Sequence, residues 1–152
     1  MTHRFRVVPA SYVMLLSPGR GGDDEVLLQL RQNTGYMDGH WASAAAGHVE
    51  RAETAYDAAR REAREEIGVE LGELTFVTSM QRTQHGDPID ERIDFFFTCR
   101  SWTGEPHIVE PEKAAALQWF PLTALPDPVV PHERVVLDGL GTGLPSYTTY
   151  GF

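Results

Sequence analysis

The chain has 152 residues, of which 41% are hydrophobic and 23% are charged, and its formal net charge is −9. This length and composition predict one globular domain over residues 1–152 with a substantial hydrophobic core, and no apolar run approaches the length of a membrane span. The acidic balance argues against non-specific binding to nucleic acids or membrane surfaces, because proteins that bind such surfaces are usually basic.

The first third of the chain alternates apolar runs with turn residues. Val7–Leu16 is apolar and is followed by Ser17-Pro18-Gly19, which predicts a buried strand and a turn. Glu25–Arg31 predicts a second strand that completes a hairpin, and the glycine-containing stretch Gln32–His40 predicts a loop. The small residues Ala42–Ala46 predict the end of a further strand.

The rest of the chain adds two helices and three strands. The segment Thr54–Ile67 is the strongest helix prediction, and the tail Leu144–Phe152 gives no clear prediction. The remaining elements are strands at Leu74–Arg82, Arg92–Trp102 and Ala116–Pro121, a turn at Asp87-Pro88, a loop at Thr103–Glu112 and a helix at His132–Leu140. The order β-β-β-α-β-β-β-α predicts an α/β fold in which helices cover both sides of a mixed sheet.

The helix Thr54–Ile67 has well-defined ends and one unusual stripe. Thr54 and Asp57 form a capping-box pattern, and Gly68 provides a C-terminal stop. At roughly 100° per residue, four alanines lie near one stripe, which permits close approach to a sheet. Toward the C-terminus this stripe continues as three carboxylates, Glu62, Glu65 and Glu66.

These carboxylates are unfavourable for the helix alone. Glu62 and Glu66 are four residues apart, where like charges repel, and anions near a helix C-terminus oppose the dipole. A divalent cation would explain three carboxylates on a partly buried stripe, and oxygen ligands favour Mg²⁺ or Mn²⁺ over zinc. The alternative is a solvated helix face with ion pairs, which charged runs usually form.

A wider pattern around this helix resembles the Nudix box. Gly47 is followed after five residues by Glu53, and after seven more by Arg61-Glu62-Ala63-Arg64-Glu65-Glu66-Ile67-Gly68-Val69. Every specified position of the box is filled. The chain is therefore similar to Nudix hydrolases, including MutT-type nucleotide pyrophosphohydrolases, and this resemblance implies a Nudix-type α/β/α sandwich.

The resemblance also implies roles for the box residues. The catalytic and metal-binding set would be Glu62, Glu65 and Glu66, together with the carbonyl of Ala46 near the metal. The structural set would be Gly47, which would permit a tight turn, the ion pair between Glu53 and Arg61, and Gly68. Related proteins commonly have Leu-Pro-Gly before the glycine; Ala44-Ala45-Ala46 departs from this pattern but removes no ligand.

A later loop offers a further acid. Related proteins often recruit one there, either as a metal ligand or as the base that activates the attacking water. Glu110 and Glu112 are the candidates, and we favour Glu110 because Trp102-Thr103-Gly104-Glu105-Pro106 followed by Glu110 resembles the matching segment of MutT-type enzymes. The alternative is two solvated loop acids.

Five residues are candidates for contact with the substrate, and three of them have an alternative role. Arg31 could meet a phosphate or remain a strand-end charge, while Tyr36 and Trp41 could stack on a base or pack in the core. Arg82 and His85 could face the cleft.

Two classes of function remain open. The first is a Mg²⁺- or Mn²⁺-dependent hydrolase that cleaves a diphosphate linkage in a small nucleotide-like substrate, with the attached group left open among nucleoside triphosphates, nucleotide sugars and dinucleoside polyphosphates. The second is a Nudix-fold module that senses a nucleotide without turnover, which the intact Glu62, Glu65 and Glu66 disfavour. The single cysteine, Cys99, and an N-terminus without an apolar signal segment predict a cytoplasmic setting.

Overall fold

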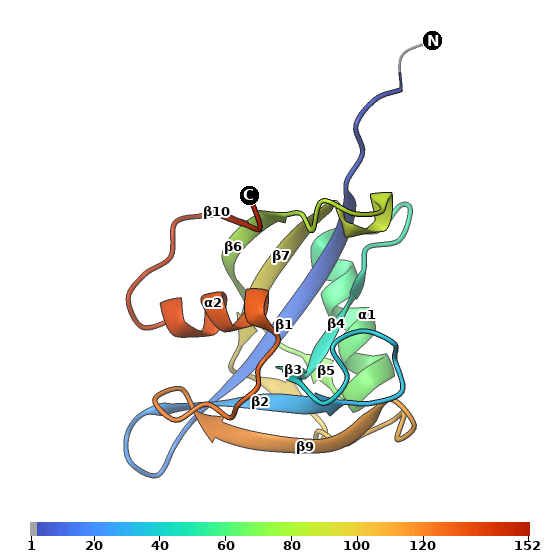
Figure 1. Cartoon of the computed structure of the whole chain (residues 1–152). Helices are drawn as coiled ribbons and strands as arrows, with labels where there is room; N and C mark the ends of the chain where they lie inside the picture. Colours follow the sequence, from blue (N-terminus) through green and yellow to red (C-terminus); the bar gives the residue numbers. More distant parts are fainter. Residues whose placement is uncertain (1–2) are drawn as a thin grey trace.

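The computed structural model describes residues 3–152 and has three layers, in which a large mixed sheet lies between two helices (Figure 1). The strands of the large sheet are β1 (Val8–Pro18), β2 (Asp24–Arg31), β3 (Trp41–Ser43), β4 (Ala45–His48), β6 (Leu74–Arg82), β7 (Arg92–Cys99), β9 (Ala114–Pro121) and β10 (Tyr147–Tyr150). The other elements are α1 (Ala55–Ile67), α2 (Pro131–Gly139), a small sheet of β5 (Glu70–Leu71) and β8 (Trp102–Thr103), and the 3-10 helix η1 (Pro88–Asp90).

Strand β1 organises the sheet. The strand order is β10-β6-β7-β1-β2-β3, with β4 also paired to β1 and β9 to β2. β1 runs parallel to β7 and antiparallel to β4 and β2. Its residues Ala10–Val13 pair with β4, whereas Leu16–Pro18 pair with β2. β4 and β2 therefore pair with different parts of β1, and the candidate site lies near the junction of β4 and β2.

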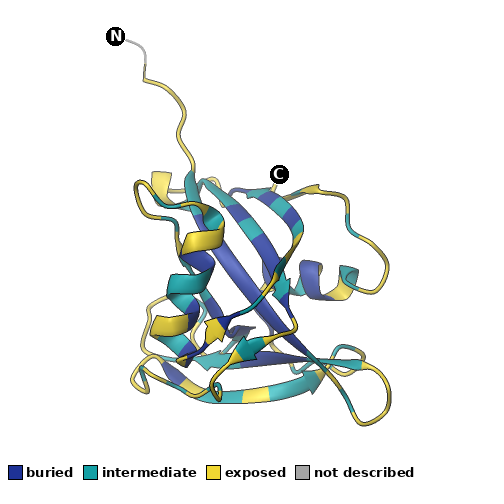
Figure 2. Cartoon of the chain, turned by 180° about the vertical axis from the view of Figure 1, so that it is seen from behind, coloured by how far each residue is buried: buried dark blue, intermediate teal, exposed yellow. Residues whose placement is uncertain are grey.

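The two faces of the sheet carry separate hydrophobic cores. The core that includes α1 contains Val13, Leu15, Ala59, Ala63 and Ile67. The core that includes α2 contains Tyr12, Met14, Leu16, Val136 and Leu137. Because neighbouring side chains of β1 point to opposite faces, the two helices cover opposite sides of the sheet, and Figure 2 shows the buried residues concentrated in the strands between them. This arrangement confirms the predicted α/β/α class.

Helix α1 has the ends that its sequence predicts. The Thr54 side chain accepts from the Asp57 backbone N–H, the Asp57 side chain accepts from the Thr54 N–H, and Gly68 ends the helix with φ of 69°. The alanines Ala58, Ala59 and Ala63 are fully buried against the sheet. Within residues 3–152, neither helix has the length and apolar character that crossing a bilayer requires.

Several strand boundaries differ from the sequence prediction. The expected strand Ala42–Ala46 is two strands, β3 and β4, which separate at Ala44 and pair with different partners, β2 and β1. The expected strand Arg92–Trp102 ends at Cys99, and Trp102 belongs to β8, which pairs with β5. The tail, whose structure the sequence analysis does not predict, contributes β10, which runs parallel to β6.

Candidate active site

The C-terminal half of α1 lies against strand β4, and Glu66 makes the closest polar contact between them. The backbone N–H of Ala46 donates to Glu66 Oε2 over 2.7 Å. This bond fixes one carboxylate oxygen at the strand. The helix stripe predicted from the sequence therefore points toward the loop and strand that begin the box.

Gly47 is needed for space, not for a turn. Gly47 lies within β4 and pairs with Ser11. The prediction of a tight turn at this residue is therefore wrong. A Cβ atom at Gly47 would stand 2.1 Å from Glu62 Oε1, which no side chain can tolerate unless Glu62 moves. The absent side chain of Gly47 is what allows the Glu62 carboxylate to lie on the strand.

Arg61 connects the carboxylates with the loop before α1. Its guanidinium donates to both oxygens of Glu53, at 2.7 and 3.2 Å, and to the carbonyl of His48 at 3.0 Å. The same side chain donates to Glu62 Oε1 at 2.8 Å and to Glu65 Oε2 at 3.3 Å. These bonds agree with the ion pair between Glu53 and Arg61 that the box implies, and the bonds to Arg61 lower the pKa of Glu53.

Two carboxylates of the helix stripe are disfavoured in their charged forms. Burial raises the pKa of Glu62 even though Arg61 opposes the shift. Burial also raises the pKa of Glu66 to about 8, and the charges of Glu62 and Glu110 add to this effect. Glu65, in contrast, is exposed. Two partly buried carboxylates whose charged forms are disfavoured would be stabilised by a cation.

The carboxylate oxygens of the helix stripe suit a hard divalent cation, although their side chains do not converge on one position. No three His, Cys, Asp or Glu side chains among residues 3–152 converge as a formed metal site. Glu62 and Glu65 are instead turned toward Arg61. Carboxylate and carbonyl oxygens remain the ligands that Mg²⁺ and Mn²⁺ prefer, and three such carboxylates share one short helix segment.

The loop after β8 approaches Glu66. The N–H of Val109 donates to the carbonyl of Glu66 at 3.2 Å. Glu110 is half-buried, pairs with Lys113 at 3.0 Å, and is close enough for its charge to raise the pKa of Glu66. Glu112 is exposed. Of the two predicted loop acids, Glu110 is therefore the one beside the box.

A cleft of about 380 Å³ begins beside Glu66. This volume is within the usual range for small-molecule sites. The cleft combines three box residues with three of the predicted substrate contacts: Ala46, Gly47 and Glu66 with Arg31, Tyr36 and Arg82. Gln29, His48, Arg92 and Glu133 also line it. Helix, strands and loops that are distant in sequence thus form one hollow next to the carboxylates.

The predicted substrate contacts have different surroundings. Arg31 lies over the ring of Tyr36, 5.5 Å from its centre, and donates to the Tyr36 carbonyl at 2.8 Å. Both residues line the cleft at its rim. Arg82 is buried and donates to Asp94 over 2.5 Å, which is a structural ion pair at the cleft wall.

Two predicted contacts do not line the cleft. Trp41 packs edge-on against Phe120, with ring centres 4.8 Å apart, as part of the α2 core. His85 is exposed and makes a hydrogen bond with the carbonyl of Gly151 at 2.9 Å. Trp41 therefore has its alternative role, packing in the core, and His85 makes a surface contact outside the cleft.

Sequence reasoning missed the polar side chains on the floor of the cleft. Glu133 is buried, and its Oε1 accepts from both the N–H and the Oγ of Ser43, at 2.7 and 2.6 Å. Glu133 stands in the first turn of an amphipathic helix, where an acidic residue is ordinary. No local sequence signal distinguishes it from a solvated helix residue.

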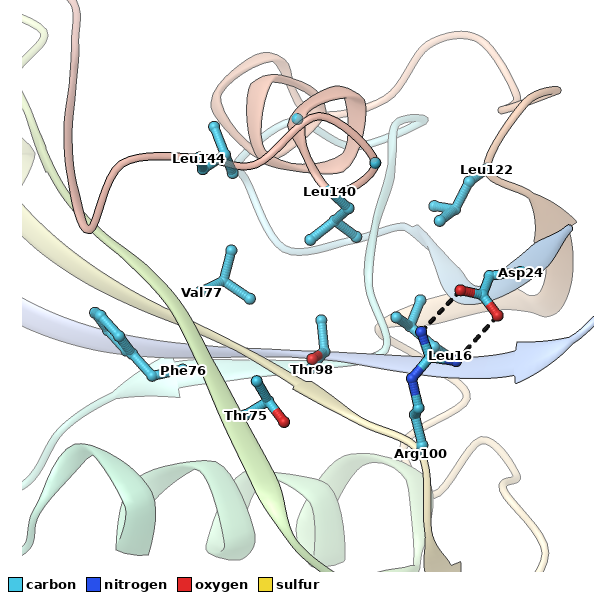
Figure 3. Close-up of a pocket in the computed structure, with 12 residues that line it drawn as sticks. Leu16, Asp24, Thr75, Phe76, Val77, Thr98, Arg100, Leu122, Leu140 and Leu144 are labelled. Atoms are coloured by element: carbon cyan, nitrogen blue, oxygen red, sulfur yellow. Dashed lines mark hydrogen bonds and ion pairs between the residues drawn. The ribbon is translucent and has the colours of Figure 1, made fainter.

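A second cavity, of about 280 Å³, lies between the sheet and the C-terminal end of α2 (Figure 3). Leucine, valine and phenylalanine side chains supply most of its labelled lining. Its charged residues, Asp24 and Arg100, already pair with each other at 2.8 Å. Because no box residue lines this cavity, we place the candidate active site in the cleft beside Glu66.

The comparisons with known proteins agree with the family resemblance of the box. A family model described as the NUDIX domain matches residues 8–140. No curated protein matches the chain. Among solved structures, the MutT NUDIX hydrolase from Burkholderia pseudomallei is 28% identical, with 86% of this chain and 98% of that chain covered and a TM-score of 0.68.

Two further structures share the fold at lower identity. A MutT protein from Bacillus halodurans is 20% identical, with 94% and 88% of the two chains covered and a TM-score of 0.67. The NUDIX domain of NrtR from Shewanella oneidensis, solved with ADP ribose, is 14% identical, with coverages of 88% and 85% and a TM-score of 0.68. The chain belongs to the NUDIX family, and it is a Nudix hydrolase.

The close approach at Gly47 generates a first prediction. In Gly47→Ala the new Cβ must displace the Glu62 carboxylate, so we expect hydrolysis to fall about a hundredfold, as for a misplaced catalytic group. The free energy of unfolding should change by only about 1 kcal/mol, because the displaced atoms end a flexible side chain.

Steady-state hydrolysis and urea denaturation measure the two effects. Gly21→Ala is the matched control, since nothing lies within 4 Å of a Cβ at Gly21. Hydrolysis by Gly47→Ala at the wild-type rate would show that the position of Glu62 on β4 is unimportant.

Proposed function

We propose that this protein is a divalent-metal-dependent hydrolase that cleaves a phosphoanhydride linkage in a nucleoside diphosphate attached to a further group, such as a nucleoside triphosphate. The observation that carries the proposal is the pair of partly buried carboxylates, Glu62 and Glu66, on the strand side of α1, of which Glu66 lines the cleft. Nothing in the described chain neutralises both, and a cation shared with an anionic substrate would.

We assign the cation, Mg²⁺ or Mn²⁺, to Glu62, Glu65 and Glu66 with the carbonyl of Ala46. When bound, such a cation neutralises charge on the phosphoryl oxygens and makes a water molecule nucleophilic. The bond from the Ala46 N–H holds Glu66 in place beforehand. Arg61, braced by Glu53, would keep Glu62 and Glu65 close together while no cation is present.

Glu110 is our candidate for the base. It is half-buried, and its charge acts on Glu66, so it can take a proton from the attacking water within the same group of carboxylates. Lys113, 3.0 Å from Glu110, would steady its position. Glu112 is exposed and has the weaker case.

Arg31 and Tyr36 are our candidates for holding the substrate at the rim of the cleft. Arg31 can donate to a phosphate oxygen, and Tyr36 presents an aromatic ring for stacking. We propose that residues 1–152 act as one domain on a small nucleotide-like substrate, and that the single buried cysteine reflects a cytoplasmic setting. A sensing module without turnover is the less favoured alternative, because the carboxylates are all retained.

The proposed function is tested by a hydrolysis screen with nucleoside triphosphates, nucleotide sugars and dinucleoside polyphosphates, with identification of the products. We expect turnover in Mg²⁺ or Mn²⁺, its loss with EDTA, and its return when Mg²⁺ is added. Turnover that continues unchanged in metal-free buffer would reject the metal-dependent mechanism, and binding without turnover across the panel would favour the sensing module.

Replacing Glu66 by glutamine separates stability from catalysis. Glu66→Gln removes a charge that burial disfavours while keeping an oxygen that can accept from Ala46. In metal-free buffer we expect a free energy of unfolding equal to or slightly above that of the wild type, with hydrolysis reduced by orders of magnitude. Denaturation curves and kinetics are compared with those of Glu73→Gln, an exposed control. Wild-type rates in Glu66→Gln would mean that the stripe is only a solvated helix face.

The two loop acids are distinguished by matched variants. We expect Glu110→Gln to lower kcat strongly with little change in apparent affinity, since a base acts in the chemical step. Glu112→Gln should have the smaller effect because its side chain is exposed. Kinetics at saturating Mg²⁺ provide the comparison. A larger loss in Glu112→Gln would transfer the role to that residue, and wild-type rates in both would point to a base within the box.

A further inference from the structure

The loop between β8 and β9, which carries Glu110, is first held at the C-terminal end of α1. The N–H of His107 donates to the carbonyl of Ile67 at 3.1 Å, and the N–H of Val109 donates to the carbonyl of Glu66 at 3.2 Å. These carbonyls belong to the last turn of the helix, where carbonyls have no partner within the helix itself. The first half of the loop is therefore bound to the helix that carries the carboxylates.

The next residues of the loop are held from a different element, by two side-chain amides that follow β2. Gln32 Nε2 donates to the carbonyl of Pro111 at 2.9 Å, and Asn33 Nδ2 donates to the carbonyl of Glu112 at 3.0 Å. Each bond joins residues that are 79 positions apart in the chain. Glu110 therefore lies between the attachment of the loop to α1 and these two amide bonds.

Amide donors suit this part of the loop. Pro111 has no backbone N–H, so its carbonyl is the only backbone group through which another element can hold it. Within residues 3–152, the backbones of Glu110, Pro111 and Glu112 make no other hydrogen bond outside their own turn. An uncharged amide supplies a donor to these carbonyls without adding a charge beside the carboxylates.

The backbone of Asn33 indicates that its amide is needed. Its φ is 55°, in the left-handed region, which asparagine tolerates better than most residues but glycine adopts most readily. The residue is exposed, so packing does not require its side chain. Glycine would suit the turn alone, but it would lack the amide that reaches Glu112.

We propose that Gln32 and Asn33 are positioning residues for the hydrolytic reaction, because their amides hold the loop so that Glu110 stays beside Glu66. This inference rests on the proposed function and deepens it, since Glu110 is the candidate base there. A base must stay within reach of the attacking water, and a misplacement of about 1 Å can cost about a hundredfold in rate. Neither Gln32 nor Asn33 lines the cleft, so their effect passes through the loop.

The experiment compares the double variant Gln32→Ala/Asn33→Gly with the wild type and with Gln118→Ala, an exposed glutamine on β9 that serves as the control. Asn33→Gly removes the amide and keeps a residue that adopts the left-handed conformation. We expect the double variant to lower kcat about tenfold with KM within about twofold of the wild type, and the control to leave both unchanged. Asn33→Gly alone should give a smaller loss in the same direction, which keeps the test valid if the double variant does not fold.

Two further measurements separate positioning from a purely structural role. In a Glu110→Gln background the base is already absent, so the double variant should lower kcat by less than about twofold. Hydrogen exchange of the Lys113 amide is the second measurement, because its N–H donates to the Glu110 carbonyl at 3.0 Å. This exchange should be faster in the double variant than in the wild type or the control.

Wild-type kcat in the double variant would overturn the inference, as would an equal fold-loss of kcat in the wild-type and Glu110→Gln backgrounds. Faster exchange at Lys113 in a protein that hydrolyses no member of the nucleotide panel would refute the proposed function alone. Hydrolysis by the wild type, with unchanged exchange at Lys113 in the double variant, would refute this inference alone.

Discussion

The site depends on how closely helix α1 approaches strand β4. Buried alanines on the helix and Gly47 on the strand leave little side-chain volume between the two backbones. The Glu62 carboxylate can therefore lie over Gly47, and the Ala46 N–H can reach Glu66. Larger residues at this contact would push the helix outward, and the carboxylates would return to water, where their pKa values would be ordinary.

This close contact holds negatively charged side chains, Glu62 and Glu66, where burial disfavours their charged forms. Arg61 offsets part of the negative charge, since it donates to Glu62 and Glu65, but the Glu66 side chain receives only a backbone N–H. A sequence selected for stability alone would not place these charges on a buried helix stripe. The two buried hydrophobic cores on opposite faces of the sheet offset the free-energy cost of these charges.

The features that sequence could predict are local ones. The ends of α1 and the carboxylate stripe follow from residue spacing within one helix, so their geometry is contained in a short segment. The contact of Glu133 with Ser43 joins residues 90 positions apart, and it exists only because α2 packs across the sheet. The orientation of Trp41 was equally inaccessible, since an aromatic residue beside a loop suits a core or a cleft equally well.

The tail strand β10 lies beyond the segment that matches the family model, yet it is part of the main sheet. Without it, the outer side of β6 would present unpaired N–H and C=O groups, the template on which strands of other molecules can add. Residues 147–150 occupy that template over Ser79–Arg82. Four residues make a poor new template themselves, so β10 covers the edge of β6 with a short strand that discourages edge-to-edge aggregation.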